Sequence, residues 1–366
     1  MLADLEELVL CESFSADVEA VARSARVVAD LGSRLLGAAP QTVVVDGVVH
    51  LRWSFGTPRV LLVGHHDTVW PIGSLTTHPW SVVDGIARGP GVFDMKAGLV
   101  QLFHALASLP SLDGVCVLVT GDEELGSLTS RALIEESARG CAAALVLEAS
   151  ADGGALKTAR KGASWYEIVV DGKAAHSGLE PEKGANAAVE AAHQILAVSG
   201  LGPLLNRDLP SPHGPDVTTV TPTLVSAGTT GNTVPARATI SVDVRAPSTA
   251  DQRRVDELIH GLTARTAGTR IRVSGGPERP PLEPASSARL FALAQQAATR
   301  LGMAPLRGVA VGGASDGNLT AGVGCPTLDG LGAVGGGAHA DDEHVVLAEM
   351  PARAALLAEL IKAVRG

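Results

Sequence analysis

The sequence predicts an α/β protein: a main domain built on a mostly parallel sheet, with a ferredoxin-like β-α-β-β-α-β unit inserted into it. Three observations lead to this prediction. Apolar runs typical of buried strands alternate with helical patterns in the first part of the chain. The order of the elements then changes between residues 161 and 278. After PERPPLEP (277–284), helix and strand patterns like those of the first part resume.

The first part supplies most of the predicted sheet. Apolar positions at helical spacing predict an amphipathic helix within residues 16–39. The predicted strands, each running into a polar loop, cover 60–68, 115–124 and 143–150. Helices are predicted between them at 97–109 and 127–138. Because parallel strands end at the same edge of a sheet, we expect ligands to bind where these strands end.

The middle of the chain has a different pattern. It predicts a strand, a helix, two strands, a helix and a strand, in that order, at 165–172, 184–198, 218–228, 238–246, 249–266 and 269–275. The last part then predicts helices at 286–301 and 347–364 and a short strand within 326–332. The predicted main domain therefore consists of residues 1–160 and 279–366, and the predicted insert of residues 161–278.

The composition is that of a globular protein. The 366 residues are 46% hydrophobic and 19% charged, which excludes disorder for the bulk of the chain. With 29 Lys+Arg against 39 Asp+Glu the formal net charge is −10, so neither nucleic acid nor a membrane surface is expected as a partner. We see no signal peptide and no uncharged apolar stretch of about 20 residues. The four cysteines are scattered without a CxxC pair, which predicts neither a thiolate metal site nor a disulfide framework. We therefore expect a cytoplasmic protein.

Candidate ligands collect at the predicted strand ends and in two loops. They are His65 and Asp67 in GHHDT, Asp94 in GPGVFDMKAG, Glu123 and Glu124 in GDEELGS, Glu148 in LEAS, and His339 in GAHADDEH. Each alone is more often a capping or solvated residue than a functional one. Carboxylates gathered at one edge of a sheet, however, repel one another unless positive charge lies between them. No basic cluster accompanies these motifs, so a divalent metal is the natural counter-ion.

The ligand types and their charges indicate two metal ions. Imidazole and carboxylate without thiolate suit Zn²⁺, Mn²⁺ or Co²⁺. Three ligating carboxylates, Asp94, Glu124 and Glu148, together with one hydroxide balance the charge of two divalent ions. Asp94 is short and lies in a tight loop, which makes it the best candidate to bridge the two ions. In extended chain Glu123 would point away from Glu124, which leaves Glu123 to act as the general base.

The orientation of the first histidine is a separate expectation. Residues two apart on a strand face the same way, so His65 and Asp67 can point together. Asp67 would then accept the far ring N–H of His65, as carboxylates often do for a metal-bound imidazole.

On these motifs the sequence resembles the M20 family of zinc peptidases and deacylases, especially its glutamate carboxypeptidase (carboxypeptidase G2-like) branch. The matching segments span nearly the whole chain: GHHDTV (64–69), GPGVFDMKAG (89–98), GDEELGS (121–127), LEAS (147–150), GKAAHSGLEPEKGANA (172–187), GNTVPARATISVDVR (231–245), GGASDGNLTAGVGCPTLDGLG (312–332) and GAHADDEH (337–344). The resemblance implies a dinuclear zinc site, with Co²⁺ or Mn²⁺ as alternatives.

The resemblance also implies a role for each candidate ligand. Asp94 would bridge the metals, one metal would bind His65 and Glu148, and the other would bind Glu124 and His339. Asp67 would be the orienting acid and Glu123 the base. The peptide bond between Asp94 and Met95 is cis in similar proteins.

For the inserted unit the resemblance implies a lid and dimerisation domain, and hence a homodimer. His176 in AAHSG resembles the histidine that reaches into the neighbouring subunit's active site and stabilises the oxyanion. Arg245 and Asn232 resemble residues that hold the free carboxylate of the substrate. Other interpretations stay open: Arg245 can form an ion pair with Asp243, His176 can cap a helix, and Asn232 can be a turn residue.

The expected activity is hydrolysis of the amide bond of an N-acyl or peptidyl amino acid, a small molecule with a free carboxylate. The reaction would use a metal-bridging hydroxide with Glu123 as base, and glutamate is the favoured released residue. The alternatives are an N-acyl-amino-acid deacylase, a desuccinylase or a dipeptidase of the same family, and a non-catalytic metal-binding homologue. Asp316 is expected either to support the substrate pocket or to cap a helix. Asp341, Asp342 and Glu343 follow His339 and can support the metal ligands, but solvated loop charge is the favoured interpretation.

Overall fold

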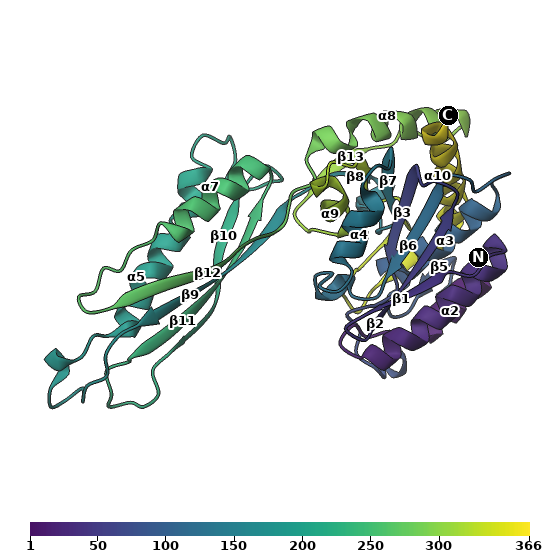
Figure 1. The fold of residues 1–366 in the computed structure, drawn as a ribbon. Helices are drawn as coiled ribbons and strands as arrows, with labels where there is room; N and C mark the ends of the chain where they lie inside the picture. The colour runs from purple at the N-terminus through teal and green to yellow at the C-terminus, as the bar shows by residue number, and fades with distance from the viewer. The chain divides into compact units, whose positions relative to one another are not determined.

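The computed structural model describes residues 1–366 and divides them into two compact units. Unit 1 consists of Met1–Ala159, Leu282–Ala310 and Ser315–Gly366, and unit 2 consists of Arg160–Pro281 and Val311–Ala314. Each unit has a hydrophobic core of its own. The chain of unit 2 is thus inserted into the chain of unit 1, and Figure 1 shows the elements of both.

Unit 1 is built on a six-stranded sheet with the order β1-β2-β6-β3-β7-β14. Its strands are β1 (Gln41–Val45), β2 (Val48–Phe55), β3 (Val60–His65), β6 (Val115–Thr120), β7 (Ala143–Val146) and β14 (Thr327–Leu328). The strands β6, β3, β7 and β14 are parallel to one another. Strand β2 runs antiparallel to both of its neighbours, β6 and β1. The three predicted strands contain β3, β6 and β7, so the α/β prediction is confirmed.

The hairpin β1–β2 is absent from the sequence prediction. Asp46 and Gly47 form its turn, with φ of 48° and 86°. Positive φ at both central residues gives the tight turn that matches strand twist, and Asp-Gly is a preferred pair for it. Because β2 pairs with β6, the hairpin covers one edge of the parallel strands and leaves β6, β3 and β7 inside the sheet.

Helices cover both faces of this sheet (Figure 1). One face packs against α1 (Leu2–Leu10), α2 (Val18–Leu36), α3 (Ala97–Ala107), α8 (Pro284–Arg300) and α10 (Met350–Arg365), and the other against α4 (Arg131–Ala138) and α9 (Asp316–Gly322). Side chains alternate along β3: Val60 and Leu62 belong to the first core, and Leu61 and Val63 to the second. Burial of both faces explains why the parallel strands are continuous apolar runs in the sequence.

Short elements complete unit 1. The strands β4 (Ser81–Val83), β5 (Ile86–Arg88), β15 (Gly335–Gly336) and β16 (His344–Val346) form a small sheet, and β8 (Leu156–Arg160) pairs with β13 (Gly308–Val311). Single helical turns lie at Ser74–Thr76, Val92–Lys96, Glu123–Leu125, Asp152–Gly154, Pro181–Lys183 (in unit 2) and Leu347–Glu349. Two of these turns carry candidate ligands.

Unit 2 is a four-stranded antiparallel sheet with the order β10-β11-β9-β12. Its elements are β9 (Gly162–Asp171), α5 (Ala187–Ser199), α6 (Leu201–Leu205), β10 (Thr219–Ala227), β11 (Arg237–Ala246), α7 (Thr249–His260) and β12 (Arg270–Arg279). Except for the short α6, this is the predicted β-α-β-β-α-β sequence of elements. Ile168 and Ile240 of the sheet share a buried core with Ala191 of α5 and Val255 of α7, and Figure 1 shows both helices along the sheet.

One helical stretch is long and apolar enough, by length and composition, to cross a membrane. It runs from Ala187 to Leu205, and 33% of it is buried. The apolar run of this stretch contains Glu190, so it is not the uncharged run of about 20 residues that the sequence analysis considers. In the structure α5 packs on the unit 2 sheet, and Glu190 accepts hydrogen bonds from the Arg265 and Thr266 N–H groups. A single stretch of this kind is weak evidence for a membrane span.

The N-terminal helix α1 is fastened to its neighbours through the buried Asp4. Its carboxylate lies 2.6 Å from Arg34 of α2 and 2.6 Å from His104 of α3. Burial alone would raise the pKa of Asp4, but these hydrogen bonds lower it to about 2. An acid with a lowered pKa stabilises the fold above its unfolded pKa, and this stabilisation is lost as the pH falls through the folded value.

We therefore expect Asp4→Asn to lower the free energy of unfolding by about 1–2 kcal/mol at pH 7, a range reduced for the exposure of Arg34. The difference from the wild type should shrink between pH 4 and pH 2. Urea unfolding at pH 7, 4 and 3 measures it. A difference that stays constant over this range would show that the charge of Asp4 does not stabilise the fold.

Candidate metal centre

The predicted ligands lie together in unit 1, at the ends of the parallel strands. His65 is the last residue of β3, Glu124 lies in the turn that follows β6, and Glu148 follows β7. Asp94 lies in the turn Val92–Lys96 before α3, and His339 in the loop between β15 and β16. Strands that share a direction deliver their C-terminal residues to one edge, as expected from the sequence.

Asp94 lies between the two histidines. Its Oδ1 is 3.3 Å from Nε2 of His65, and its Oδ2 is 3.3 Å from Nε2 of His339. A second carboxylate lies near each imidazole: Glu148 Oε1 is 3.5 Å from His65 Nε2, and Glu124 Oε2 is 3.3 Å from His339 Nε2. The structure therefore contains two imidazole–carboxylate pairs that share Asp94.

The donor atoms of this cluster fit a cation. Nε2 of His65, Oδ1 of Asp94 and Oε1 of Glu124 are buried and have no hydrogen-bond partner. A buried polar atom without a partner is costly unless a ligand satisfies it. Ligand atoms of His65, Asp94 and Glu124 lie within 4.8 Å of one another, and so do those of His65, Glu123 and Glu148. Imidazole and carboxylate groups at this spacing are a donor set for divalent metal ions.

The charges of the cluster depend on one another. Burial alone would lower the pKa of His65, but Asp67, Asp94 and Glu148 raise it well above its usual value. Hydrogen bonds to Asp94 and Glu124 raise the pKa of His339 to about 10. Burial raises the pKa of Glu124, whereas the two imidazoles outweigh burial at Asp94 and lower its pKa. The carboxylates of the cluster therefore favour positive charge among them, which bound metal ions would supply.

Asp67 organises the loop that carries the glutamates. It is fully buried, and its carboxylate accepts hydrogen bonds from the Ser15 hydroxyl (2.8 Å) and from the N–H groups of Glu123 and Glu124 (3.2 Å each). Nδ1 of His65 lies 3.5 Å from this carboxylate but only 3.0 Å from the carbonyl oxygen of Asp67. The nearer acceptor for the far ring nitrogen is therefore the carbonyl, and not the carboxylate that the sequence argument used.

The two glutamates are not in extended chain, which corrects the reason given for their separate tasks. Glu123–Leu125 is a 3₁₀ turn. The turn nevertheless sends the two carboxylates to different partners: Glu124 approaches Asp94 and His339, and Glu123 approaches His65 and Glu148. A turn of three residues separates neighbouring side chains by about 120°, which explains the divergence.

Glu343 is a residue of this site for which the structure supports the less favoured of the two interpretations. It was interpreted as solvated loop charge together with Asp341 and Asp342, which are indeed exposed. The side chain of Glu343 is instead buried, with 3% exposure. Its carboxylate accepts hydrogen bonds from N–H groups of the turn that carries Asp94. The signal in the sequence was its position four residues after His339, in a motif that also supplies a ligand.

Two backbone features belong to the same region. The peptide bond between Asp94 and Met95 is cis, as the resemblance implied. His339 has a φ of 63°, in the left-handed region that residues other than glycine rarely adopt. Residues other than glycine in the left-handed region cluster at functional sites, where the surrounding structure holds them.

Gly98 allows α3 to approach the segment after β7: a Cβ on it would lie 2.2 Å from the carbonyl oxygen of Leu147.

Asp316 supports the structure from a distance. It is buried at the start of α9, and its carboxylate accepts hydrogen bonds from the hydroxyls of Ser127 and Thr120. Ser315, and not Asp316, is the N-cap residue of α9. Because Thr120 ends β6 and Ser127 follows the glutamate turn, Asp316 holds both ends of the loop that carries Glu123 and Glu124.

The three candidates of unit 2 do not all lie together. His176 and Asn232 are exposed and close to each other: His176 bridges to Thr233, and Ser177 N–H donates to the carbonyl of Asn232. Arg245 lies near the other end of β11, eight residues after Arg237, which is about 27 Å along a strand. The structure thus brings His176 and Asn232 together and separates Arg245 from them.

Arg245 already has an anionic partner. Its Nε and Nη2 lie 3.0 Å and 2.8 Å from the carboxylate oxygens of Asp243, and its guanidinium carbon lies 5.5 Å from the ring centroid of Trp165. This is the ion pair that the sequence left open. It holds the guanidinium in one orientation with part of its fork remaining for a second carboxylate.

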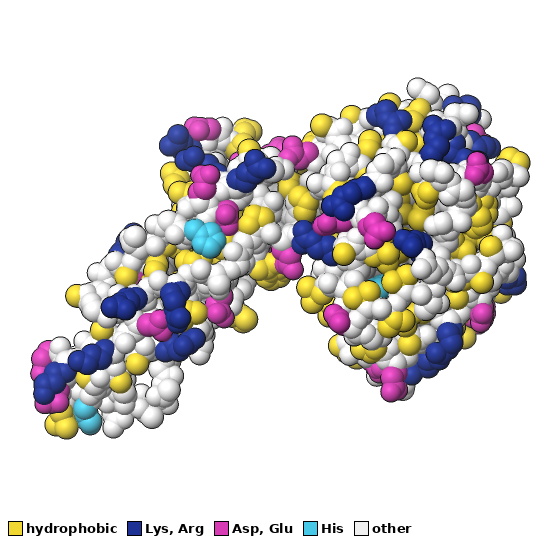
Figure 2. All heavy atoms as spheres, in the orientation of Figure 1, with side chains coloured by type: hydrophobic (Ala, Val, Ile, Leu, Met, Phe, Trp, Pro, Cys, Tyr) yellow, Lys and Arg dark blue, Asp and Glu magenta, His cyan; other side chains and the backbone are white.

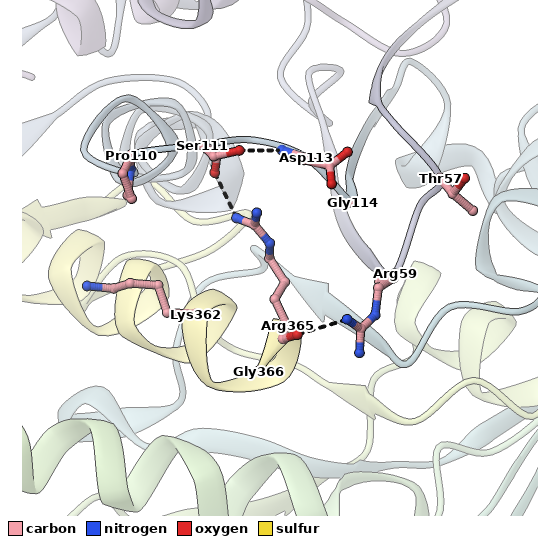
Figure 3. Close-up of a pocket in the computed structure, with 9 residues that line it drawn as sticks. All are labelled: Thr57, Arg59, Pro110, Ser111, Asp113, Gly114, Lys362, Arg365 and Gly366. Atoms are coloured by element: carbon pink, nitrogen blue, oxygen red, sulfur yellow. Dashed lines mark hydrogen bonds between the residues drawn. The ribbon is translucent and has the colours of Figure 1, made fainter.

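A pocket of about 560 Å³ lies away from this centre (Figure 3). Arg59 and Gly114, which line it, directly precede β3 and β6, so the pocket lies where the parallel strands begin. It contains none of the predicted ligands. In Figure 3, Arg365 donates to the carbonyl of Ser111, and Arg59 to the carbonyl of Arg365.

On the face shown in Figure 2, basic and acidic side chains are interspersed.

An α/β unit with imidazoles and carboxylates grouped at the ends of its parallel strands is typical of metal-dependent hydrolases. Comparison with known proteins gives the family: residues 61–363 match Peptidase family M20/M25/M40. The chain belongs to this family and is a metal-dependent hydrolase.

Relatives cover almost all of the chain. Carboxypeptidase G2 from Pseudomonas sp. (strain RS-16) is 29% identical over 99% of this chain and 88% of its own. Succinyl-diaminopimelate desuccinylase from Gluconacetobacter diazotrophicus is 29% identical over 84% of this chain and 82% of its own. The crystal structure of an M20 family metallo-carboxypeptidase from Sulfolobus solfataricus has the same fold, with a TM-score of 0.77 over 99% of this chain and 98% of its own, at 17% identity.

Proposed function

We propose that this protein is a dinuclear metal-dependent carboxypeptidase that hydrolyses the amide bond of N-acyl or peptidyl amino acids, with glutamate favoured as the released residue. The observation that carries the proposal is the position of Asp94, whose two oxygens face two separate imidazole–carboxylate pairs. Two metal ions held about 3.5–4 Å apart need a shared ligand of this kind. The similarity to carboxypeptidase G2 over 99% of the chain supports the carboxypeptidase assignment.

Each ion would have its own ligands in this proposal. His65 and Glu148 would hold one ion, Glu124 and His339 the other, and Asp94 both. Zn²⁺ suits this nitrogen and oxygen donor set, as do Co²⁺ and Mn²⁺. When bound, the ions would supply an activated water and polarise the carbonyl of the amide. Asp67 would keep the glutamate turn in place and support the orientation of His65.

Glu123 is the proposed general base. A carboxylate oxygen of Glu123 lies within 4.8 Å of ligand atoms of His65 and Glu148. From there it can take a proton from the attacking water and pass it to the amine nitrogen that leaves. The other four carboxylates each have a ligand or an orienting task, which leaves Glu123 as the acid–base group.

Unit 2 would act as a lid and as the dimerisation domain. Arg245 would hold the free carboxylate of the substrate, with Asn232 as a second contact, and His176 would stabilise the oxyanion. Arg245 lies at one end of the unit 2 sheet, and His176 and Asn232 lie at the other end. An active site that contains all three residues would therefore take Arg245 from one subunit and His176 and Asn232 from its partner. The edge strand β10 exposes Leu224 and Val225, with 69% and 55% exposure, which fits an interface between two copies.

Subunit mixing tests this arrangement. We expect His176→Ala and Glu123→Gln each to abolish most of the activity. A mixture of the two variants, unfolded and refolded together, should regain about a quarter of the wild-type activity, because half of the dimers are mixed and each mixed dimer has one intact site. If no activity returns although mixed dimers form, His176 acts within its own subunit or not at all.

The favoured location is the cytoplasm. All four cysteines are free, with three of them buried, which suits a reducing compartment. The preferred substrate would be a small molecule with a free carboxylate.

The similarity to a desuccinylase over 84% of the chain favours a second candidate, which would release a succinyl group. An N-acyl-amino-acid deacylase, a dipeptidase and a non-catalytic metal-binding homologue are the remaining alternatives. The non-catalytic alternative leaves Glu123 without a task.

A substrate panel with and without added zinc distinguishes these candidates. One acyl group is kept while the released residue is varied over glutamate, aspartate, lysine, alanine and an amidated glutamate, and an N-succinyl amine is added as a separate substrate. We expect a metal-dependent rate that is highest for glutamate and lost with the amide. A metal-dependent rate that is highest for the succinyl substrate would favour the desuccinylase assignment over the carboxypeptidase assignment. If none of the substrates is hydrolysed, the proposed activity on N-acyl amino acids is contradicted.

A further inference from the structure

The carboxylate of Glu343 is buried beside the metal centre and has no task in the proposed reaction. Oε1 accepts hydrogen bonds from the N–H groups of Phe93 and Asp94, each 2.9 Å away. Oε2 accepts from the N–H of Gly91 at 2.9 Å and from the indole N–H of Trp70 at 2.7 Å. Each oxygen has two donors, so the carboxylate is fully satisfied without a metal ion.

These contacts make Glu343 a connector and not a ligand. Two of its four donors, the N–H groups of Phe93 and of Asp94 itself, belong to the turn that carries Asp94, and a third, the N–H of Gly91, directly precedes this turn. Glu343 itself lies four residues after His339, at the end of the loop that carries this histidine. One side chain therefore joins the loop of His339 to the turn of Asp94, at the point where Nε2 of His339 lies 3.3 Å from Oδ2 of Asp94.

Burial raises the pKa of Glu343, and its N–H donors offset part of this effect. Charge-assisted hydrogen bonds from N–H groups are stronger than neutral ones. The buried ammonium of Lys96, at the end of the same turn, lies within electrostatic range of Glu343 and offsets part of the cost of burying it. By contrast, neighbouring Asp341 has a side-chain exposure of 92%.

We propose that Glu343 is a positioning residue that sets the distance between Asp94 and His339, and thereby the affinity of the metal position that these two residues share with Glu124. The proposal rests on the dinuclear site described above. It predicts a selective effect, because Glu343 lies in the loop that carries His339, whereas His65 and Glu148 stand on β3 and after β7. The metal position formed by His65 and Glu148 should therefore keep most of its affinity when Glu343 is changed.

The test is a competition titration of zinc against a chelating dye, on the metal-free protein and its Glu343→Gln variant. Glutamine has the same shape, but its single carbonyl oxygen can accept only two of the four hydrogen bonds, and its amide N–H₂ faces the remaining donors. We expect two zinc ions per chain in the wild type. In the variant, one ion should bind about 10- to 100-fold more weakly, which is the loss of affinity typical when a group that orients a metal ligand is changed. The affinity for the other ion should stay within about threefold of the wild-type value.

Asp342→Asn is the matched control, since it changes the adjacent exposed acid and should leave both affinities unchanged. Glu343→Asp is the second variant, in case glutamine prevents folding. It keeps the charge but is one methylene shorter, and we expect the same selective weakening of one ion. Circular dichroism of the metal-free proteins verifies that each variant is folded.

The outcomes separate this inference from the proposed function. A wild type that binds fewer than two ions contradicts the dinuclear site, and the inference with it. A wild type that binds two ions, with a folded Glu343→Gln variant that binds both as tightly, overturns the role of Glu343 alone. Equal weakening of both ions would also overturn it, because Glu343 would then support the whole centre and not one position.

Discussion

Replacement of Glu123 by glutamine is expected to lower kcat by about 10²- to 10⁴-fold, the range that a general base contributes, while the metal content stays the same. Glutamine keeps the volume of the side chain but cannot accept a proton at neutral pH. The N–H of Glu123, which donates to Asp67, is a backbone group and remains in the variant. The loss should therefore appear in kcat, with little change in KM. Steady-state kinetics and elemental analysis of the purified variant measure both quantities.

Glu136→Gln is the control for this experiment, because Glu136 is an exposed acid on α4. It should leave kcat and the metal content unchanged. A Glu123→Gln variant that retains most of its activity would show that another group transfers the proton. A variant that loses metal together with activity would instead identify Glu123 as a ligand, which its position near His65 and Glu148 also permits.

The second large effect is expected for Asp94→Ala. The two carboxylate oxygens of Asp94 each lie 3.3 Å from one of the two imidazoles, so its removal would take a ligand from both proposed metal positions at once. We expect fewer than one bound metal ion per chain and a loss of activity of at least about 10³-fold, since both nucleophile activation and carbonyl polarisation depend on the ions.

Metal content and kcat are again the quantities to measure. Asp341→Ala removes an exposed acid from the loop of His339 and should change neither. If the Asp94→Ala variant keeps two ions, Asp94 does not bridge them. If it keeps one ion and substantial activity, the reaction needs a single metal.

The sequence predicts the parallel strands of unit 1 well, because a local hydrophobic pattern determines where these strands form. The apolar runs of β3, β6 and β7 are buried on both faces, and a candidate ligand lies at the end of each run or within four residues after it, so periodicity and chemistry agree there. The hairpin β1–β2 had an equally local signal in Asp46-Gly47, which the prediction did not use.

Glu343 and Arg245 show where local pattern is insufficient. Three consecutive acids in a glycine-rich loop are usually solvated, and only the tertiary packing of Gly91, Phe93 and Asp94 around Glu343 makes one of them buried. Likewise, residues thirteen apart in one motif, Asn232 and Arg245, lie at opposite ends of β11, because a strand of ten residues runs between them. Spacing in sequence predicts which residues share a motif but not which end of a sheet they reach.

The central claim is that His65, Asp94, Glu124, Glu148 and His339 hold two metal ions, and a crystal structure with zinc tests it most directly. Anomalous scattering at the zinc edge locates each ion independently of the protein model. We predict two peaks per chain, about 3.5–4 Å apart, on either side of Asp94, one beside His65 and Glu148 and the other beside Glu124 and His339. A single peak, or peaks bound by other residues, would contradict the account.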